Sequence, residues 1–492
     1  MGSLVTDDND RRPLLPCAGD EKPYGAVPPR QDHVKVVVYT RRWYYLAVFC
    51  VVCYSYGLHA SVFSPIAHSF EQAYGWTNAD MATVLNWPNL IYLFLFLPFA
   101  WVLETHGLRA ACVLGVSFLV LGSGLRCVYI TPAASYWTMQ FGQALTGTTS
   151  CIVFAAPSCM SATWFPAHQR TTATAASPIA MALGGATSFL LGPLLVPVHA
   201  NASSGNDTTP PTQGDIDDIR NSISLVFYIN FAVAALAFLL VVIHFPARPP
   251  HPPSPSAAIV RTDVRHALPA LMRNRRFLTL GFIFSVTNGI AFSFMGVLDV
   301  DLKAARVSDD QTVTGSLIII AVFGTCLFSL AVATVADRCT RHVKALLLSL
   351  YVGGAVMFLW FALIVQGLVV PNAISLYVSF IGGTVLMNAA LPIFYELACD
   401  SCYPTPETLA NGVLNAMSCF ASMIFLGVLM APGVGTGWMN WCMVGACLVC
   451  VPILVPYRQR YGRLIVDTDI CVDSTDPTDT RILGPADDVV ST

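Results

Sequence analysis

Charged side chains are scarce in this chain. Asp, Glu, Lys and Arg make up 11% of its 492 residues, whereas hydrophobic residues make up 55%. A soluble protein carries about 25% charged residues, so the composition excludes an ordinary soluble domain. The mean hydropathy is +0.62, and the charges gather in a few segments that leave apolar windows of about 20 residues between them. The sequence therefore predicts an all-α polytopic membrane protein.

Motifs of catalysis and cofactor binding are also missing. The sequence has no His-Glu-x-x-His, no paired aspartates within an apolar window, no nucleophile elbow and no nucleotide-binding loop. Most of the 16 cysteines lie inside apolar windows, where Cys acts as a small apolar side chain. The pair Cys399 and Cys402 has no second pair and no His beside it in sequence. We therefore expect no enzyme, no cofactor, no metal site and no nucleic-acid partner.

Twelve apolar windows are predicted to cross the membrane as helices. No secretory signal precedes the first window, so we expect it to remain as an uncleaved anchor. An even number of spans places both termini on the same side. The windows begin near Trp43, Ala79, Arg109, Trp137, Thr171, Ser222, Phe277, Thr312, Val343, Asn372, Leu409 and Gly437.

The distribution of Lys and Arg predicts the orientation. If the N-terminus is cytosolic, the cytosolic segments hold 22 of the 26 Lys and Arg residues, as the positive-inside rule requires. Two acceptor sequons, at Asn201 and Asn206, lie in a loop on the opposite side, where glycosylation takes place. We therefore expect both termini in the cytosol, with Asn201 and Asn206 as glycosylation sites on the lumenal face.

A Pro-rich stretch over residues 246–276 divides six windows from six. We expect a cytosolic linker there, between helix bundles over 43–245 and 277–457, with cytosolic tails over 1–42 and 458–492. Two strings recur in the halves. WVLETHGLRAACVL has a counterpart in ATVADRCTRHVKALL, and ATWFPAHQRTTATA has one in DSCYPTPETLANGV. A duplicated six-span unit is typical of a transporter whose bundles rock about a site near the middle of the membrane.

The first pair of strings resembles the loop motif of the major facilitator superfamily. The resemblance implies a twelve-helix fold and a cytosolic gate closed by an acid and a base on facing loops. The first copy has Glu where the motif usually has Asp, and the second copy has no Gly. Arg170, on the predicted cytosolic turn before the fifth window, is expected to belong to the same gate. The other gating residues are Glu104, Gly107, Arg109, Asp337, Arg338 and Arg341.

Longer strings resemble solute carrier family 49, the FLVCR-related transporters. They are TWFPAHQRTTATA, LGGATSFLLGPLLVP, GLRC, GVLD and PIFYELACDSCYPTPE. The string GLRC, the Pro-rich linker and RRPLLP in the N-terminal tail are similar to a lysosomal subgroup, which implies proton-driven export of pyridoxine (vitamin B6) to the cytosol. Asn415, in GVLNAMS, is instead similar to the choline- and haem-linked members. A plasma-membrane choline, ethanolamine or haem facilitator is therefore one alternative, and a non-transporting receptor or scaffold is another.

The N-terminal tail contains an acidic dileucine pattern. Asp10 precedes Leu14 and Leu15 by four and five residues, the form that clathrin adaptors read when they sort proteins to lysosomes. The pattern predicts a clathrin adaptor as partner and a location in the lysosomal membrane, with the plasma membrane as the alternative.

Three titratable residues are candidates for proton coupling. Glu396 lies within the tenth window, where a carboxylate marks a transport pathway or proton relay because its burial is costly; its other reading is a part of the gate. Asp299 follows the seventh window; its alternative role is that of a helix-end carboxylate exposed to water. His59 lies in the first window and can titrate in the pH range of an acidic organelle; its alternative role is a structural one, hydrogen-bonded between helices. Arg126 is expected to snorkel to the lumenal interface or to pair with a lumenal acid.

Amides and one indole within the windows are candidates to line a central cavity. In apolar surroundings such groups suit a small polar aromatic solute or a quaternary ammonium ion; their competing role is hydrogen bonding between helices. The expected partners therefore also include this small organic solute, protons and membrane lipids. The residues are Asn86, Trp87, Asn89, Gln140, Gln143, Asn288, Asn388 and Asn415.

Overall fold

The computed structural model describes residues 37–128, 132–196, 213–246, 249–251, 253–254, 264–305, 311–338, 342–369, 372–403, 405–429 and 436–457. All of them belong to one compact unit, Lys35–Thr492. Every regular element within these ranges is a helix. The predicted sorting residues Asp10, Leu14 and Leu15 and the sequons at Asn201 and Asn206 lie outside the described residues, as does Arg341.

The helices of the first half form what we call the N-terminal bundle. In chain order its elements are α1 (Arg42–Ala60), the 3₁₀ turn η1 (Ser64–Ile66), α2 (Ala67–Tyr74), α3 (Asn78–Arg126), α4 (Pro132–Gly147), α5 (Ser150–Ala155), α6 (Pro157–Trp164), η2 (Ala167–Gln169), α7 (Arg170–Leu195) and α8 (Gln213–His244).

The helices of the second half, after the linker helix α10 (Val264–Arg273), form the C-terminal bundle. Its elements are α11 (Arg275–Ala304), α12 (Gln311–Arg338), α13 (Val343–Val365), α14 (Ala373–Asn388), α15 (Leu391–Cys402), α16 (Glu407–Leu429) and α17 (Trp438–Leu454).

The predicted number of spans agrees with the helices. Among the described residues, nine candidate spans are long and apolar enough to cross a membrane, with α3 taken as one and α14 with α15 as another. α3 is two spans, because Gly107 interrupts it with a φ of 82°, a left-handed conformation that glycine adopts without strain. The broken series α4 to α6 and the shorter apolar helix α17 complete twelve.

Two predicted spans are broken rather than continuous. The fourth span ends one helix at Ala155 and begins the next at Pro157, and the tenth ends α14 at Asn388 and resumes with Pro392 in the first turn of α15. Proline has no N–H to donate and its ring clashes with the preceding turn, so it interrupts a helix. Both breaks occur at equivalent places in the two halves, which supports the internal repeat seen in the sequence.

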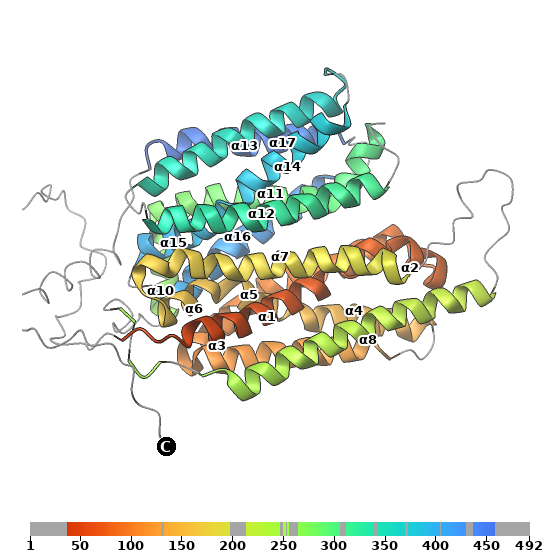
Figure 1. Cartoon of the computed structure of the whole chain (residues 1–492), viewed down its shortest axis with the longest axis horizontal. Coiled ribbons are helices and arrows are strands. Elements are labelled where there is room, and N and C mark those ends of the chain that lie inside the picture. The colour runs from red at the N-terminus through yellow and green to blue at the C-terminus, as the bar shows by residue number, and fades with distance from the viewer. Residues whose placement is uncertain are drawn as a thin grey trace, which may run out of the picture. The chain divides into compact units, whose positions relative to one another are not determined.

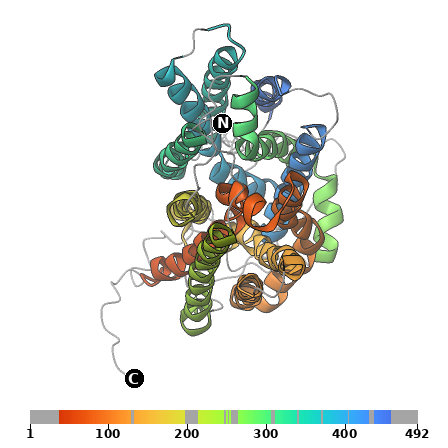
Figure 2. The ribbon, with the colours of Figure 1, turned by 90° about the vertical axis from the view of Figure 1, so that its right-hand side faces the viewer.

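Each bundle has its own hydrophobic core. One cluster of buried apolar side chains is drawn from α1, α3, α5 to α8 and one residue of α16, and a second from α10 to α17. α7 and α12 run side by side where the halves meet (Figure 1). Seen end on, helices of the first half, coloured red to yellow-green, separate from most of those of the second half, coloured green to blue (Figure 2).

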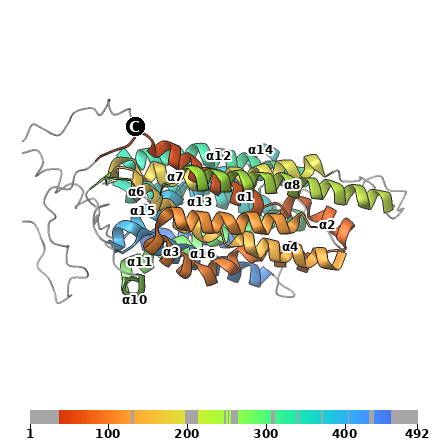
Figure 3. The same cartoon turned by 90° about the horizontal axis from the view of Figure 1, so that it is seen from below.

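The helix bundles have two ends, which are named here by the helices that lie at them. α6, α10 and α15 lie at one end, which we call the α10 end, and α2 lies at the other, the α2 end (Figures 1 and 3). α3 starts at the α2 end, reaches the α10 end at Gly107 and returns, so Arg126 lies towards the α2 end.

Candidate functional site

Asp337 joins the two bundles at the α10 end. Its carboxylate accepts hydrogen bonds from the backbone N–H groups of Thr171 (2.9 Å) and Thr172 (2.7 Å) and from the Thr172 hydroxyl (2.6 Å). α7 begins at Arg170, and the first N–H groups of a helix have no partner within it and carry the positive end of its dipole. A carboxylate of the C-terminal bundle therefore caps a helix of the N-terminal bundle.

Glu104 makes the corresponding contact from the other half. It accepts a hydrogen bond from the hydroxyl of Thr408, in the first turn of α16, which begins at Glu407. The repeated strings explain the symmetry, because each half's copy of the first string provides an acid that meets the other half's copy of the second string. We call the two contacts, Glu104–Thr408 and Asp337–Thr171/Thr172, the lock.

Two of the arginines expected in the gate, Arg109 and Arg170, donate hydrogen bonds to groups other than Asp337. The resemblance implied an acid and a base on facing loops, but Asp337 meets backbone N–H groups instead. Arg109 donates to the carbonyl oxygen of Val242 near the end of α8 (3.1 Å), within its own bundle. Arg170 is buried and donates to the hydroxyl of Ser254 in the linker, and Arg338 is exposed. The helix starts therefore take the place of the expected base at Asp337.

Behind the lock, polar contacts continue between the bundles. Glu396 of α15 accepts a hydrogen bond of 2.7 Å from the hydroxyl of Thr174, which lies 2.8 Å from the hydroxyl of Ser161. Asn411 donates to the Ser158 hydroxyl (2.7 Å) and Asn415 to the Phe154 carbonyl (3.3 Å). We call Glu396–Thr174, Asn411–Ser158 and Asn415–Phe154 the polar ladder.

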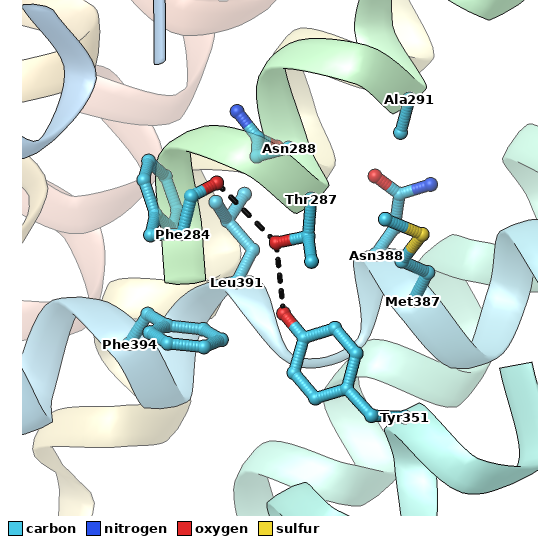
Figure 4. Close-up of a pocket in the computed structure, with 9 residues that line it drawn as sticks. All are labelled: Phe284, Thr287, Asn288, Ala291, Tyr351, Met387, Asn388, Leu391 and Phe394. Carbon is cyan, nitrogen blue, oxygen red and sulfur yellow. Dashed lines mark hydrogen bonds between the residues drawn. The ribbon is translucent and has the colours of Figure 1, made fainter. Parts of the chain in front are cut away.

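A small cavity lies within the C-terminal bundle. Its volume is about 10 Å³, room for a single water molecule. Figure 4 shows the Thr287 hydroxyl in this wall, between the Phe284 carbonyl (3.3 Å) and the Tyr351 hydroxyl (3.0 Å). A neighbouring cavity of the same size shares three lining residues. The lining of the first consists of Phe284, Thr287, Asn288, Ala291, Tyr351, Met387, Asn388, Leu391 and Phe394.

The eight predicted lining residues occupy several places. Only Asn288 and Asn388 line the cavities of the C-terminal bundle; Asn288 donates to the Ser418 hydroxyl (2.9 Å) and Asn388 to the Thr384 carbonyl (2.9 Å). Asn415 belongs to the polar ladder, and Asn89 accepts from the thiol of Cys419 across the bundles (3.8 Å).

The other four lie in the N-terminal bundle. Trp87 donates from its indole nitrogen to the side-chain oxygen of Gln140 (2.8 Å), and Gln143 accepts from Arg126. Asn86 is half-buried on α3. That all eight residues line one central cavity stays a prediction, and it concerns a state in which the bundles have moved.

His59 hydrogen-bonds within its own helix rather than to a neighbouring one. It is fully buried in α1, and its Nδ1 lies 2.6 Å from the carbonyl oxygen of Ser55. Asp299 lies in α11, but its side chain is outside the described part of the structure. Of the three proton candidates, Glu396 is the one found at a contact between the bundles.

Asp301 and Arg126, both near the ends of apolar windows, turn inward. Asp301 is 1% exposed and accepts a hydrogen bond from the amide of Asn440 (2.8 Å), while its Oδ1 and the Oδ1 of Asn440 have no partner in the described structure. Arg126 is 3% exposed, and its hydrogen-bond acceptors are neutral, so it neither snorkels nor pairs with an acid there. A charge at the edge of an apolar window reads as solvated, and one sequence gives no signal that it folds inward.

Replacing Asp301 by Asn is expected to stabilise the protein more at neutral than at acid pH. Burial raises the pKa of the Asp301 carboxyl, so this group stabilises the fold at low pH and loses that contribution as the pH rises through its folded pKa. Asn resembles the protonated acid and offers an N–H group to the unpaired oxygen of Asn440, a gain of about 1–3 kcal/mol. The unfolding temperatures of Asp301→Asn and wild type are compared at about pH 5 and about pH 7.5. The exposed control Asp217→Asn should leave the unfolding temperature unchanged at both pH values. If the difference in unfolding temperature between Asp301→Asn and wild type is no larger at about pH 7.5 than at about pH 5, the raised pKa of Asp301 is contradicted.

Comparison with known proteins gives agreeing results. Residues 46–426 match the family model of the Major Facilitator Superfamily. The Solute carrier family 49 member 4 homolog of Xenopus laevis is 34% identical over 481 residues, which cover 96% of this chain and 100% of that protein. The Choline/ethanolamine transporter FLVCR1 of Mus musculus is 25% identical over 439 residues, or 86% of this chain and 74% of that one.

Solved structures are similar in fold. The crystal structure of the major facilitator superfamily transporter FucP in the outward conformation superimposes with a TM-score of 0.60 at 13% identity, over 84% of this chain and 98% of that chain.

Proposed function

Because the chain belongs to the major facilitator superfamily and, within it, to solute carrier family 49, we propose that it is a lysosomal secondary transporter that moves a small organic solute, unchanged, by alternating access. The lock carries this proposal. Each of its contacts joins a carboxylate of one bundle to the start of a helix of the other. Separation at the lock would part the bundles and leave each with its own hydrophobic core, apart from Cys419 of α16, which packs in the N-terminal cluster; this is the motion that alternating access requires.

The substrate we propose is pyridoxine, carried to the cytosol with protons. Support comes from the resemblance to the lysosomal subgroup and from 34% identity to a member 4 homolog. The rings of Phe284, Tyr351 and Phe394 and the amides of Asn288 and Asn388 around one cavity suit a flat heteroaromatic ring with hydroxyl groups. The cavity admits only a water molecule in this state, so binding belongs to a more open one.

Choline or ethanolamine is the second candidate. The relative FLVCR1 is named for both, and aromatic faces attract quaternary ammonium ions. The presence of Asn415 in GVLNAMS, similar to that branch, favours the same class.

The orientation we propose places the lock at the cytosolic face. Positive-inside counting puts the loops that carry Glu104 and Asp337 in the cytosol together with both tails. The dileucine pattern of Leu14 and Leu15 would then face the clathrin adaptor that sorts the protein to lysosomes.

One uptake experiment tests location and substrate together. Leu14→Ala with Leu15→Ala is expected to move the protein to the cell surface, where uptake of labelled pyridoxine and choline is measured at about pH 5 and about pH 7.5. Leu4→Ala with Val5→Ala, in the same tail, is the matched control that should stay on lysosomes. Saturable pyridoxine uptake that rises at acid pH supports the proposal. Choline uptake without pH dependence supports the second candidate, and uptake of neither by a surface-located protein contradicts transport of both.

A further inference from the structure

Arg126 brings a positive charge into the interior of the N-terminal bundle. It is the last residue of α3 and is 3% exposed. Its Nη2 donates to the carbonyl of Gly142 (3.4 Å) and to the side-chain oxygens of Gln143 and Thr146. All three acceptors belong to α4 and all are neutral, so the charge has no counter-ion among these contacts.

Most of the donor capacity of this cluster is unused. Nε and Nη1 of Arg126 are buried without a hydrogen-bond partner in the described residues, which leaves three of the five guanidinium N–H groups without an acceptor. The amide nitrogen of Gln143, whose oxygen accepts from Arg126, is also buried without a partner. Unmet donors and unpaired charges destabilise a buried site, and a charge kept inside a membrane protein at that cost indicates a functional role.

Among the described residues, the groups that surround the guanidinium provide no negative charge. The ring of Phe63 lies 5.4 Å from the Arg126 Cζ, a favourable but partial compensation. His59 is close enough for its charge and that of Arg126 to interact. Its Nδ1 meets the Ser55 carbonyl at 2.6 Å and its Nε2 has no partner in the described structure.

We propose that Arg126 and Gln143 form a binding site for a small oxyanion, a carboxylate or a phosphate group. The planar guanidinium matches the oxygens of these groups in geometry and charge. An oxyanion would accept the unused N–H groups of both residues and neutralise the buried charge, whereas the same charge repels an organic cation. The site lies in the N-terminal bundle and the cavity lined by Asn288 and Asn388 in the C-terminal bundle, so the inference does not depend on which organic solute is carried.

Aromatic side chains cover the site in this state. The ring of Phe63 packs against those of Phe70 (5.3 Å), Phe227 (5.8 Å) and Trp76 (6.2 Å between centroids). α1 ends at Ala60 and η1 begins at Ser64, so Phe63 lies on irregular backbone between them. Phe63 is fully buried in this state, so an anion that arrives from the α2 end must displace its ring.

Anion binding by the purified full-length protein tests the proposal. The unfolding temperature is followed by tryptophan fluorescence in nanodiscs of neutral phosphatidylcholine, with sodium phosphate, sodium acetate or sodium chloride at equal ionic strength. We expect phosphate or acetate to raise it saturably and chloride not to. Arg126→Gln should raise the half-saturating anion concentration about tenfold or more. Arg126→Lys, which keeps the charge, should give a concentration between those of wild type and Arg126→Gln.

Arg220→Gln is the matched control. Its guanidinium lies at the same end but is already used by the Ala73 carbonyl and Asp217, so the anion response should equal that of wild type. If Arg126→Gln does not fold, Gln143→Leu takes its place and should weaken anion binding in the same direction. Equal responses of wild type and the folded variants, or an equal rise with chloride, would overturn the proposal.

Nanodiscs with anionic phosphatidylglycerol distinguish the source of the oxyanion. A free anion raises the unfolding temperature equally in both kinds of nanodisc. A lipid headgroup raises it in anionic nanodiscs without added salt, and further phosphate or acetate then adds nothing. Either source supports the site if Arg126→Gln removes the rise, and a rise that persists in Arg126→Gln contradicts it.

Discussion

Asp337→Asn is expected to open the lock and expose the interior behind it. The substitution removes the charge that faces the start of α7 and puts an amide N–H group against the N–H groups of Thr171 and Thr172. Hydrogen bonds to a charged group and its attraction to a helix start contribute about 2 kcal/mol here, so the open population should rise roughly thirtyfold.

A native cysteine reports this opening. Cys399 is buried on α15, and its thiol lies 3.9 Å from the side-chain oxygen of Asn411 in the polar ladder. In purified protein its alkylation, followed by mass spectrometry, should speed up by about the same factor because it tracks the open population. Cys447, fully buried in the C-terminal core, should not change.

A matched acid separates the lock from charge alone. Asp217 is 57% exposed and pairs with Arg220 at 3.3 Å, a surface contact of little energetic value, so Asp217→Asn should leave Cys399 protected. Adding Glu104→Gln to Asp337→Asn should expose Cys399 further than either change does singly. Alkylation of Cys399 at the wild-type rate in the double variant would show that these contacts do not close the α10 end.

If transport is coupled to protons as proposed, Glu396→Gln is expected to remove the acid stimulation of uptake. The amide keeps an oxygen for the Thr174 hydroxyl, now 2.7 Å from the carboxylate, but does not exchange a proton. Occupancy of a proton site changes up to about tenfold per pH unit, so the ratio of uptake at about pH 5 to that at about pH 7.5 should fall from several-fold to about one.

Thr174→Val is the companion variant. It removes the hydrogen bond and leaves the carboxylate, so uptake should remain pH-dependent. Unchanged acid stimulation in Glu396→Gln would place proton coupling elsewhere and leave Glu396 as a contact between bundles.

The sequence predicted the spans because scarce charge and apolar windows depend on the membrane alone. Gly107 was recognised within the loop motif, and its positive φ is the turn between two spans. The breaks before Pro157 and Pro392 were missed because an apolar window reads the same whether its helix is continuous or interrupted. A proline follows both breaks, but Pro88 and Pro98 lie inside α3 without interrupting it, so proline alone does not identify a break.

The lock was half predicted. The repeated strings identified Glu104 and Asp337, but their partners are the first residues of α16 and α7, and backbone N–H groups at a helix start have no residue signature. The inward turn of Arg126 and Asp301 was also beyond the sequence. Their partners Gln143 and Asn440 lie on other helices. Hydropathy does not tell whether a charged residue at the end of an apolar window faces the protein interior or the solvent.

The distance between the bundles at the α10 end tests alternating access most directly. His168 before α7 and His342 before α13 are both exposed at that end, one in each half, and can carry spin labels attached through non-natural residues for pulsed electron paramagnetic resonance. Alternating access predicts a short distance in wild type and a second, longer population that grows in Asp337→Asn and with transported substrate. A single unchanged distance in all three conditions would contradict the claim that this lock opens during transport.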